Sequence, residues 1–165
     1  TRIQRLVEVD GEIVSSSRVR AEIAAGDMEG ARRSLGVPYM LEGEVVGGEK
    51  RGRELGFPTA NIVPDPRLVT PGHGVYAAFA NGHPAAVNVG TRPTFDSKLG
   101  VLIETHLIDF SGDLYGDTLR VAFVEKMRDE LAFDDVDALV AQIDNDVEEA
   151  RRICADFTEA AARGG

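Results

Sequence analysis

Residues 75–89 read VYAAFANGHPAAVNV, and this stretch decides the fold class. Asn81 and Gly82 lie between two short apolar runs, and both residues tolerate the positive φ angles of a tight hairpin turn. Comparable runs, separated by Gly, Pro, Asn and Asp, recur between residues 40 and 126. Together these patterns predict six strands, at 41–46, 59–63, 75–80, 85–89, 101–109 and 118–125.

No long helical pattern interrupts the strand-rich stretch, so parallel β-α-β units are not expected. An antiparallel barrel or sandwich is favoured instead. Helices are expected only at the two ends of the chain. Residues 134–162 carry an apolar stripe at helical spacing, opposite the acidic side chains, with Asp134 or Asp135 as the N-cap. The stripe consists of Val136, Leu139, Val140, Ile143 and Val147.

Residues 1–36 predict a short strand, a turn at Asp10-Gly11 and two short helices. Residues 15–17 are three serines, which are suitable N-caps, and Gly26 is suited to end the first helix. Asp27 is placed to cap the second helix, which then ends at Leu35-Gly36.

The composition limits the class of protein. A chain of 165 residues, 43% of them hydrophobic, is about one soluble globular domain in size. Cys154 is the single cysteine, so neither an intrachain disulfide nor a cysteine-based zinc site is expected. There is no apolar run of the roughly 20 residues that span a bilayer, and no signal-peptide core follows the first residues. These features are typical of a cytoplasmic protein.

The net charge of −10 argues against a general nucleic-acid binder, because neutralising phosphates requires clustered Lys and Arg. Three basic residues nevertheless gather beside glycines, at Lys50, Arg51 and Arg53. A local basic loop on an acidic protein suits a small polyanion. The alternative is a solvated basic loop without a ligand.

The basic residues belong to a glycine-rich stretch, GGEKRGRELG at 47–56, followed by FPTAN at 57–61. Glycines let the backbone approach a ligand and turn N–H groups toward it. If the chain is extended from Thr59, Thr59 and Asn61 point to the same face. A hydroxyl and an amide oxygen are hard ligands suited to Mg²⁺ with phosphate and water. The alternative is an ordinary hairpin loop with a surface Thr and Asn.

Glu104 lies in the middle of an otherwise apolar strand, VLIETHLIDF at 101–110. Alternation places Glu104 and His106 on one face, opposite Ile103 and Leu107. A carboxylate among apolar neighbours indicates a partner or a function, and Glu104 is our candidate general base. The alternative is a barrel face with Glu104 and His106 turned to water. His106 and Asp109 have weaker cases, and we expect structural roles for both.

Residues 52–61, GRELGFPTAN, resemble the signature of the riboflavin kinase (flavokinase) family. Further segments resemble the same family in order and spacing, so that the resemblance covers about residues 38–155. These are GVYA at 74–77, NVGTRPTF at 88–95, IETHLIDF at 103–110, LYG at 114–116, and MRDE at 127–130 with Phe133, Leu139, Gln142, Ile143 and Asp146.

The resemblance implies a six-stranded antiparallel Greek-key barrel with a C-terminal helix. It implies transfer of the γ-phosphate of Mg-ATP to the 5′-hydroxyl of riboflavin, giving FMN and ADP. Glu104 would be the catalytic base, Thr59 and Asn61 would hold Mg²⁺, and Phe57 with residues 128–139 would border the flavin. The expected binding residues are Gly47, Lys50, Gly52, Arg53, Gly56, Phe57, Pro58, Thr59, Asn61, Asn88 and Arg128.

Residues 14–20, VSSSRVR, resemble an element near the end of the FMN adenylyltransferase domain of bacterial bifunctional FAD synthetases. We therefore expect residues 1–36 to be a remnant of that domain and residues 37–165 to form the kinase domain, with the adenylyltransferase half absent. The alternative is that the serines only cap a helix.

A second class of function stays open, a regulatory barrel that binds a flavin or a nucleotide without chemistry. Such a binder would not need Thr59, Asn61 and Glu104 together, and their joint presence favours the kinase.

Overall fold

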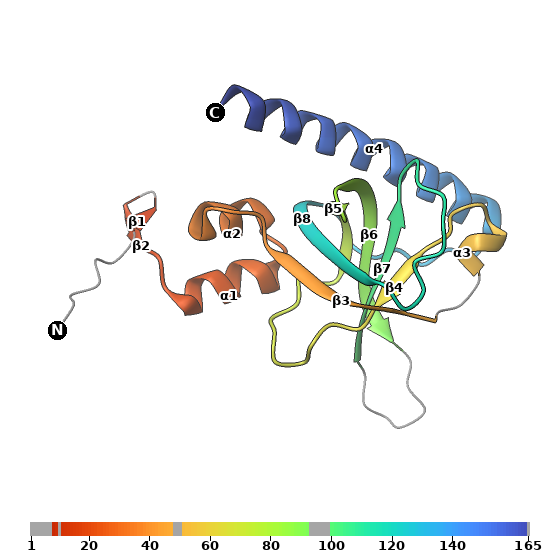
Figure 1. Ribbon diagram of the computed structural model, residues 1–165, viewed down its shortest axis with the longest axis horizontal. Helices are drawn as coiled ribbons and strands as arrows, with labels where there is room; N and C mark the ends of the chain where they lie inside the picture. Colours follow the sequence, from red (N-terminus) through yellow and green to blue (C-terminus); the bar gives the residue numbers. More distant parts are fainter. Residues whose placement is uncertain (1–7, 10, 48–50, 93–99, 165) are drawn as a thin grey trace.

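The computed structural model describes residues 8–9, 11–47, 51–92 and 100–164. Six antiparallel strands form a closed barrel in the order β3-β4-β7-β6-β5-β8, and β8 pairs back onto β3 (Figure 1). This confirms the expected antiparallel barrel of six strands. The strands are β3 (Met40–Val46), β4 (Ala60–Ile62), β5 (Gly74–Ala80), β6 (His83–Arg92), β7 (Gly100–Leu107) and β8 (Thr118–Arg128).

The β5–β6 hairpin is the most local part of the barrel. Asn81 and Gly82 have φ angles of 47° and 84°, and Ala80 pairs directly with His83 across the turn. The Asn81 side chain also reaches β8, because its Oδ1 accepts the Arg120 N–H at 2.9 Å. The turn therefore links the β5–β6 hairpin to β8, which lies far from it in the sequence.

The strand bounds differ from expectation by up to three residues at several strand ends. β6 runs to Arg92 because its last residues still pair with the start of β7. β7 ends at Leu107 rather than Asp109, because Asp109 takes a left-handed backbone with φ of 56°. Near the N-terminus, β1 (Glu8–Val9) and β2 (Glu12–Ile13) form a small hairpin where one short strand was expected.

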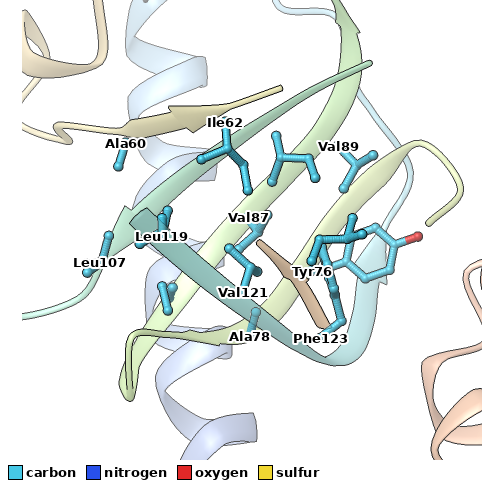
Figure 2. Packing of buried hydrophobic residues seen from close by; sticks show 14 of the residues in the cluster. Ala60, Ile62, Tyr76, Ala78, Val87, Val89, Leu107, Leu119, Val121 and Phe123 are labelled. Carbon is cyan, nitrogen blue, oxygen red and sulfur yellow. The ribbon is translucent and has the colours of Figure 1, made fainter. Parts of the chain in front are cut away.

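The barrel interior is apolar and tightly filled. Figure 2 shows side chains from β4 through β8 converging on a common centre, with Tyr76 edge-on to Phe123 at 5.4 Å between ring centroids. Tyr76 directs its hydroxyl out of this cluster, to the Gly72 carbonyl at 2.5 Å. Because side chains alternate along each strand, the outer face can carry polar side chains where α4 does not cover it.

The long helix α4 (Val136–Arg163) covers part of the barrel's outer face (Figure 1). Its N-cap is Asp135, one of the two expected residues. Val147, Ala150 and Ile153 pack on Ala77 and Val124 of the barrel. The expected apolar stripe is only partly buried, because Val136 in the first turn is 49% exposed.

Helices α1 (Ser16–Ala25) and α2 (Met28–Leu35) begin and end at the expected caps. The Ser15 and Asp27 side chains accept N–H groups of the first turns, and Gly26 and Gly36 take left-handed conformations. Ile23, Met28 and Ala31 join the same apolar cluster as the barrel interior. Among the described residues, no helix combines the length and apolarity that crossing a bilayer requires.

Burial of Cys154 gives a direct test of how α4 is seated. Its thiol donates to the Ala78 carbonyl at 3.3 Å and is almost fully enclosed, and burial raises the pKa of the Cys154 thiol. We expect the native protein to react slowly with a thiol reagent such as DTNB, and the chain unfolded in guanidinium chloride to release one equivalent at once. Fast, complete reaction of the native protein would show that α4 does not cover β5 as described.

Candidate active site

Three polar side chains form a row across neighbouring strands. Asn61 of β4 pairs in register with Glu104 of β7, and Glu104 pairs with Asn88 of β6. The residues on either side of each, such as Ile62 and Ile103, point into the apolar interior, so the row lies on the barrel's outer face. The expected alternation around Glu104 is confirmed.

The Glu104 carboxylate has an amide partner within this row. Asn88 Nδ2 donates to Glu104 Oε2 at 3.2 Å. The bond restricts the rotation of the carboxylate and uses one of its two oxygens. Within the described residues, the other oxygen, Oε1, accepts no hydrogen bond, which leaves it available to a ligand hydroxyl.

Asn61 is buried, with 3% of its surface exposed, yet its Oδ1 has no hydrogen-bond partner in the described part of the chain. An unpaired buried carbonyl oxygen is unfavourable unless a ligand satisfies it. Thr59, two residues earlier, and Asn61 both line one pocket, described below. Within the described residues, no three His, Cys, Asp or Glu side chains gather to hold a metal, so the oxygens of Thr59 and Asn61 are the better candidates for a hard cation.

A pocket of about 400 Å³ opens beside this pair. Arg53 supplies a cation to its wall, and Phe110 and Tyr115 supply aromatic rings. Tyr115 is 71% exposed, and a side-chain carbon placed on Gly47 would lie 3.9 Å from its ring. The pocket thus combines charge and hydrogen-bonding groups with flat apolar surface, which suits a phosphorylated ligand carrying an aromatic ring.

The glycine-rich stretch contains a short helix, α3 (Arg51–Glu54), where a loop was expected. Phe57 N donates to Gly52 O at 2.7 Å and Gly56 N to Arg53 O at 3.2 Å, so the segment closes on itself. A side chain on Gly52 would meet the Phe57 carbonyl at 2.5 Å, and Gly56 has φ of 89°. Both glycines are therefore required by geometry. Lys50 lies outside the described residues.

His106 anchors the end of this segment to β7. Its Nδ1 lies 2.8 Å from the Pro58 carbonyl, which can only accept, so Nδ1 carries the proton. The Phe57 ring stands edge-on to the His106 ring, with centroids 5.7 Å apart. These contacts hold Pro58 and Thr59 beside the strand that carries Glu104. Asp109, two residues after β7, forms an ion pair with Arg151 of α4.

Arg128 lies at the end of β8 and belongs to the same row, because Val75 pairs with both Asn88 and Arg128. Its guanidinium is bound by Asp146 of α4. Sequence reasoning placed Arg128 at the site but found no partner for it. It also gave Glu130 no individual role beyond its place in the range 128–139. A Cβ atom added to Gly90 would lie 2.5 Å from Oε1 of Glu130.

Comparison with known proteins identifies the family of the chain. A family model described as riboflavin kinase matches residues 35–154. The bifunctional riboflavin kinase/FMN adenylyltransferase of Pseudomonas fluorescens is 42% identical over 153 residues, covering 90% of this chain and 49% of the relative. The chain spans about half the length of the curated relatives it matches.

Solved structures similar to the chain include the following two. A macrolide-efflux protein from Streptococcus pneumoniae superposes with a TM-score of 0.82 at 37% identity, over 88% of this chain and 49% of that one. Riboflavin kinase from Trypanosoma brucei superposes with a TM-score of 0.54 at 26% identity, over 71% of this chain and 80% of that one.

A closed barrel with a pocket lined by Thr59, Asn61 and Arg53, close to the strand that bears Glu104, has the features of a small-ligand-binding domain. The matches narrow this class: the chain belongs to the riboflavin kinase (flavokinase) family, and it is homologous to the C-terminal half of the bacterial bifunctional enzymes.

The closed turn at 52–57 predicts a local effect of Gly52→Ala. The added carbon meets backbone rather than a flexible side chain, so the turn must open at a cost of about 1–3 kcal/mol. Limited trypsin cleavage after the exposed Arg53 should then accelerate by about fivefold or more. Gly100→Ala is the control, because open space surrounds Gly100. Equal cleavage of both variants would contradict the turn geometry.

Proposed function

We propose that the chain transfers the γ-phosphate of Mg-ATP to the 5′-hydroxyl of riboflavin, giving FMN and ADP. The observation that carries this proposal is the row Asn61–Glu104–Asn88. It sets a carboxylate beside an amide oxygen that is unpaired among the described residues, and next to a pocket containing Arg53. Riboflavin as the acceptor is supported by membership of the family rather than by the residue chemistry.

In the proposed reaction, Glu104 is the general base. One carboxylate oxygen is held by Asn88, and the other accepts the proton of the acceptor hydroxyl as that oxygen attacks the γ-phosphorus. The bond between the γ-phosphorus and the bridging oxygen breaks, and ADP leaves. Phosphoryl transfer depends mainly on positioning and on neutralising charge, and the rigid strand pairing supplies the first requirement.

Thr59 and Asn61 fit a magnesium ion, because both offer oxygens and the Asn61 oxygen is buried without a partner. When bound, the ion would neutralise charge on the nucleotide phosphates. Arg53 adds a second positive charge to the same pocket. Gly47 and the exposed Tyr115 ring border the remaining volume, in which we place the nucleoside.

We place the flavin on the other side of Glu104, between Phe57 and residues 128–139. We also propose that residues 1–36 end an adenylyltransferase domain and that residues 37–165 are the kinase domain. The length of the bifunctional relatives supports this division, since the chain covers only 49–50% of the first two. The adenylyltransferase domain would then be a covalently attached partner in the full-length protein.

The direct test is conversion of riboflavin to FMN by the 165-residue chain with Mg-ATP, followed by chromatography. Glu104→Gln keeps the shape of the side chain and removes its basicity, so we expect kcat to fall by about 10²–10⁴-fold. Glu125→Gln is the matched control, because Glu125 is an exposed glutamate on β8, outside the row.

Two outcomes would overturn parts of this proposal. Riboflavin binding without any FMN would favour the non-catalytic barrel. A Glu104→Gln variant with near-wild-type kcat would remove Glu104 from the role of base while leaving the kinase assignment intact.

Loss of the unpaired amide oxygen should appear in the magnesium dependence. Asn61→Ala removes one proposed ligand, and a contact with a charged group contributes about 1.5–3 kcal/mol. We therefore expect the magnesium concentration at half-maximal rate to rise by about tenfold or more. Asn145→Ala, at an exposed position on α4, is the control. An unchanged magnesium titration for Asn61→Ala would exclude Asn61 as a ligand.

A further inference from the structure

An ion pair joins α4 to the end of β8 with two well-formed bonds. Arg128 Nε donates to Asp146 Oδ1 at 3.0 Å, and Arg128 Nη2 donates to Asp146 Oδ2 at 2.6 Å. Gln142, one turn earlier on α4, donates to the same Oδ1 at 3.0 Å. Asp146 is 7% exposed, so its carboxylate is held by three donors and largely shielded from water.

The third nitrogen of Arg128 fixes the chain that leaves β8. Arg128 Nη1 donates to the Asp129 carbonyl at 2.9 Å. Asp146 therefore orients a guanidinium that in turn sets the backbone direction at Asp129. We call this arrangement the Asp146 clamp, comprising Asp146, Gln142, Arg128 and the Asp129 carbonyl.

The segment that follows the clamp lies next to the catalytic row. Glu130 places its carboxylate over Gly90 and beside Asn88, the residue that holds Glu104. Leu131, the next residue, is 54% exposed, and Val136 at the start of α4 is exposed to a similar degree. The segment 129–135 thus starts directly after Arg128 and carries the exposed Leu131, an apolar surface that a planar ring would cover.

Stability alone does not account for the clamp. Burying an ion pair costs desolvation that its attraction often only offsets, and an apolar pair of similar volume can serve equally well for folding. A second ion pair, Arg151–Asp109, also links α4 to the barrel, but its side chains are 42% and 74% exposed and it contacts no residue of the row. The Arg151–Asp109 pair therefore attaches α4 to the barrel without contacting the row. The Arg128–Asp146 pair attaches α4 and also orients segment 129–135.

We propose that Asp146 is a positioning residue that, through Arg128, holds segment 129–135 in the geometry that binds the flavin ring. The proposal rests on the proposed function for the identity of the acceptor. It assigns the clamp to recognition of the acceptor and not to recognition of the nucleotide, whose pocket is lined by other elements.

The test is Asp146→Asn, which keeps the shape of the side chain but removes the charge that fixes the guanidinium. We expect the KM for riboflavin to rise at least about tenfold, while the KM for Mg-ATP changes less than about twofold. Riboflavin affinity, measured by quenching of its own fluorescence, should weaken by the same factor. Asp109→Asn is the matched control, and Asn tolerates the left-handed backbone at that position.

A double variant separates positioning from stability. Arg128→Met with Asp146→Leu replaces the ion pair by apolar side chains, so its melting temperature should return toward that of the wild type. We expect riboflavin binding to stay weak in this variant, because nothing then holds the Asp129 carbonyl. Wild-type riboflavin affinity in the double variant, or equal increases of both KM values in Asp146→Asn, would overturn the proposal.

The binding measurement also separates this proposal from the proposed function. A wild-type chain that makes no FMN refutes the kinase activity, whereas the fluorescence titration still reports whether the clamp shapes a flavin site. A wild-type chain that makes FMN, together with unchanged riboflavin affinity in Asp146→Asn, refutes the clamp alone.

Discussion

The register between β4, β7 and β6 is the constraint on which the rest of the site depends. Side chains alternate across each strand, so a slip of one residue in β7 would turn Glu104 into the apolar interior and bring Ile103 or Thr105 to the surface. The full burial of Ile103 makes such a slip costly. The apolar core therefore fixes the register that keeps Asn61, Glu104 and Asn88 side by side on neighbouring strands.

Packing on both sides of the sheet then places the other parts of the site. β5 is buried on its inner face by the barrel core and on its outer face by α4, and for that reason it reads as an almost continuous apolar run. Where α4 stops covering the barrel, toward its N-terminus, the outer face becomes polar. The Asp146 clamp joins the end of β8 to α4 near this end of the helix, and Leu131 in the segment after β8 is exposed.

Features with local causes were predictable from the sequence. The hairpin at Asn81-Gly82 and the caps at Ser15 and Asp27 depend on residues within a few positions, and the structure contains all of them. The outward face of Glu104 followed from alternation alone. The family resemblance was needed to propose riboflavin as the acceptor, because oxygen ligands and cationic side chains alone do not identify the acceptor molecule.

Features that depend on distant contacts were not predictable. The partner of Arg128 lies 18 residues later on another element, and Glu130 meets Gly90 only because the barrel closes. The helix α3 forms in a glycine-rich segment whose local propensity favours a loop, and it is supported by the Gly52–Phe57 contact and by the anchoring of Pro58 to His106. Each of these needs the tertiary structure before its physical cause is visible.

The central claim is that chemistry occurs at the row formed by Asn61, Glu104 and Asn88. A crystal structure of the chain with Mg-ADP and riboflavin tests it most directly. The account predicts that the 5′-hydroxyl lies within hydrogen-bond distance of the Glu104 carboxylate, that Mg²⁺ is ligated by Asn61, and that ADP fills the pocket beside Arg53. A riboflavin molecule whose 5′-hydroxyl points away from Glu104, with ADP outside that pocket, would contradict it.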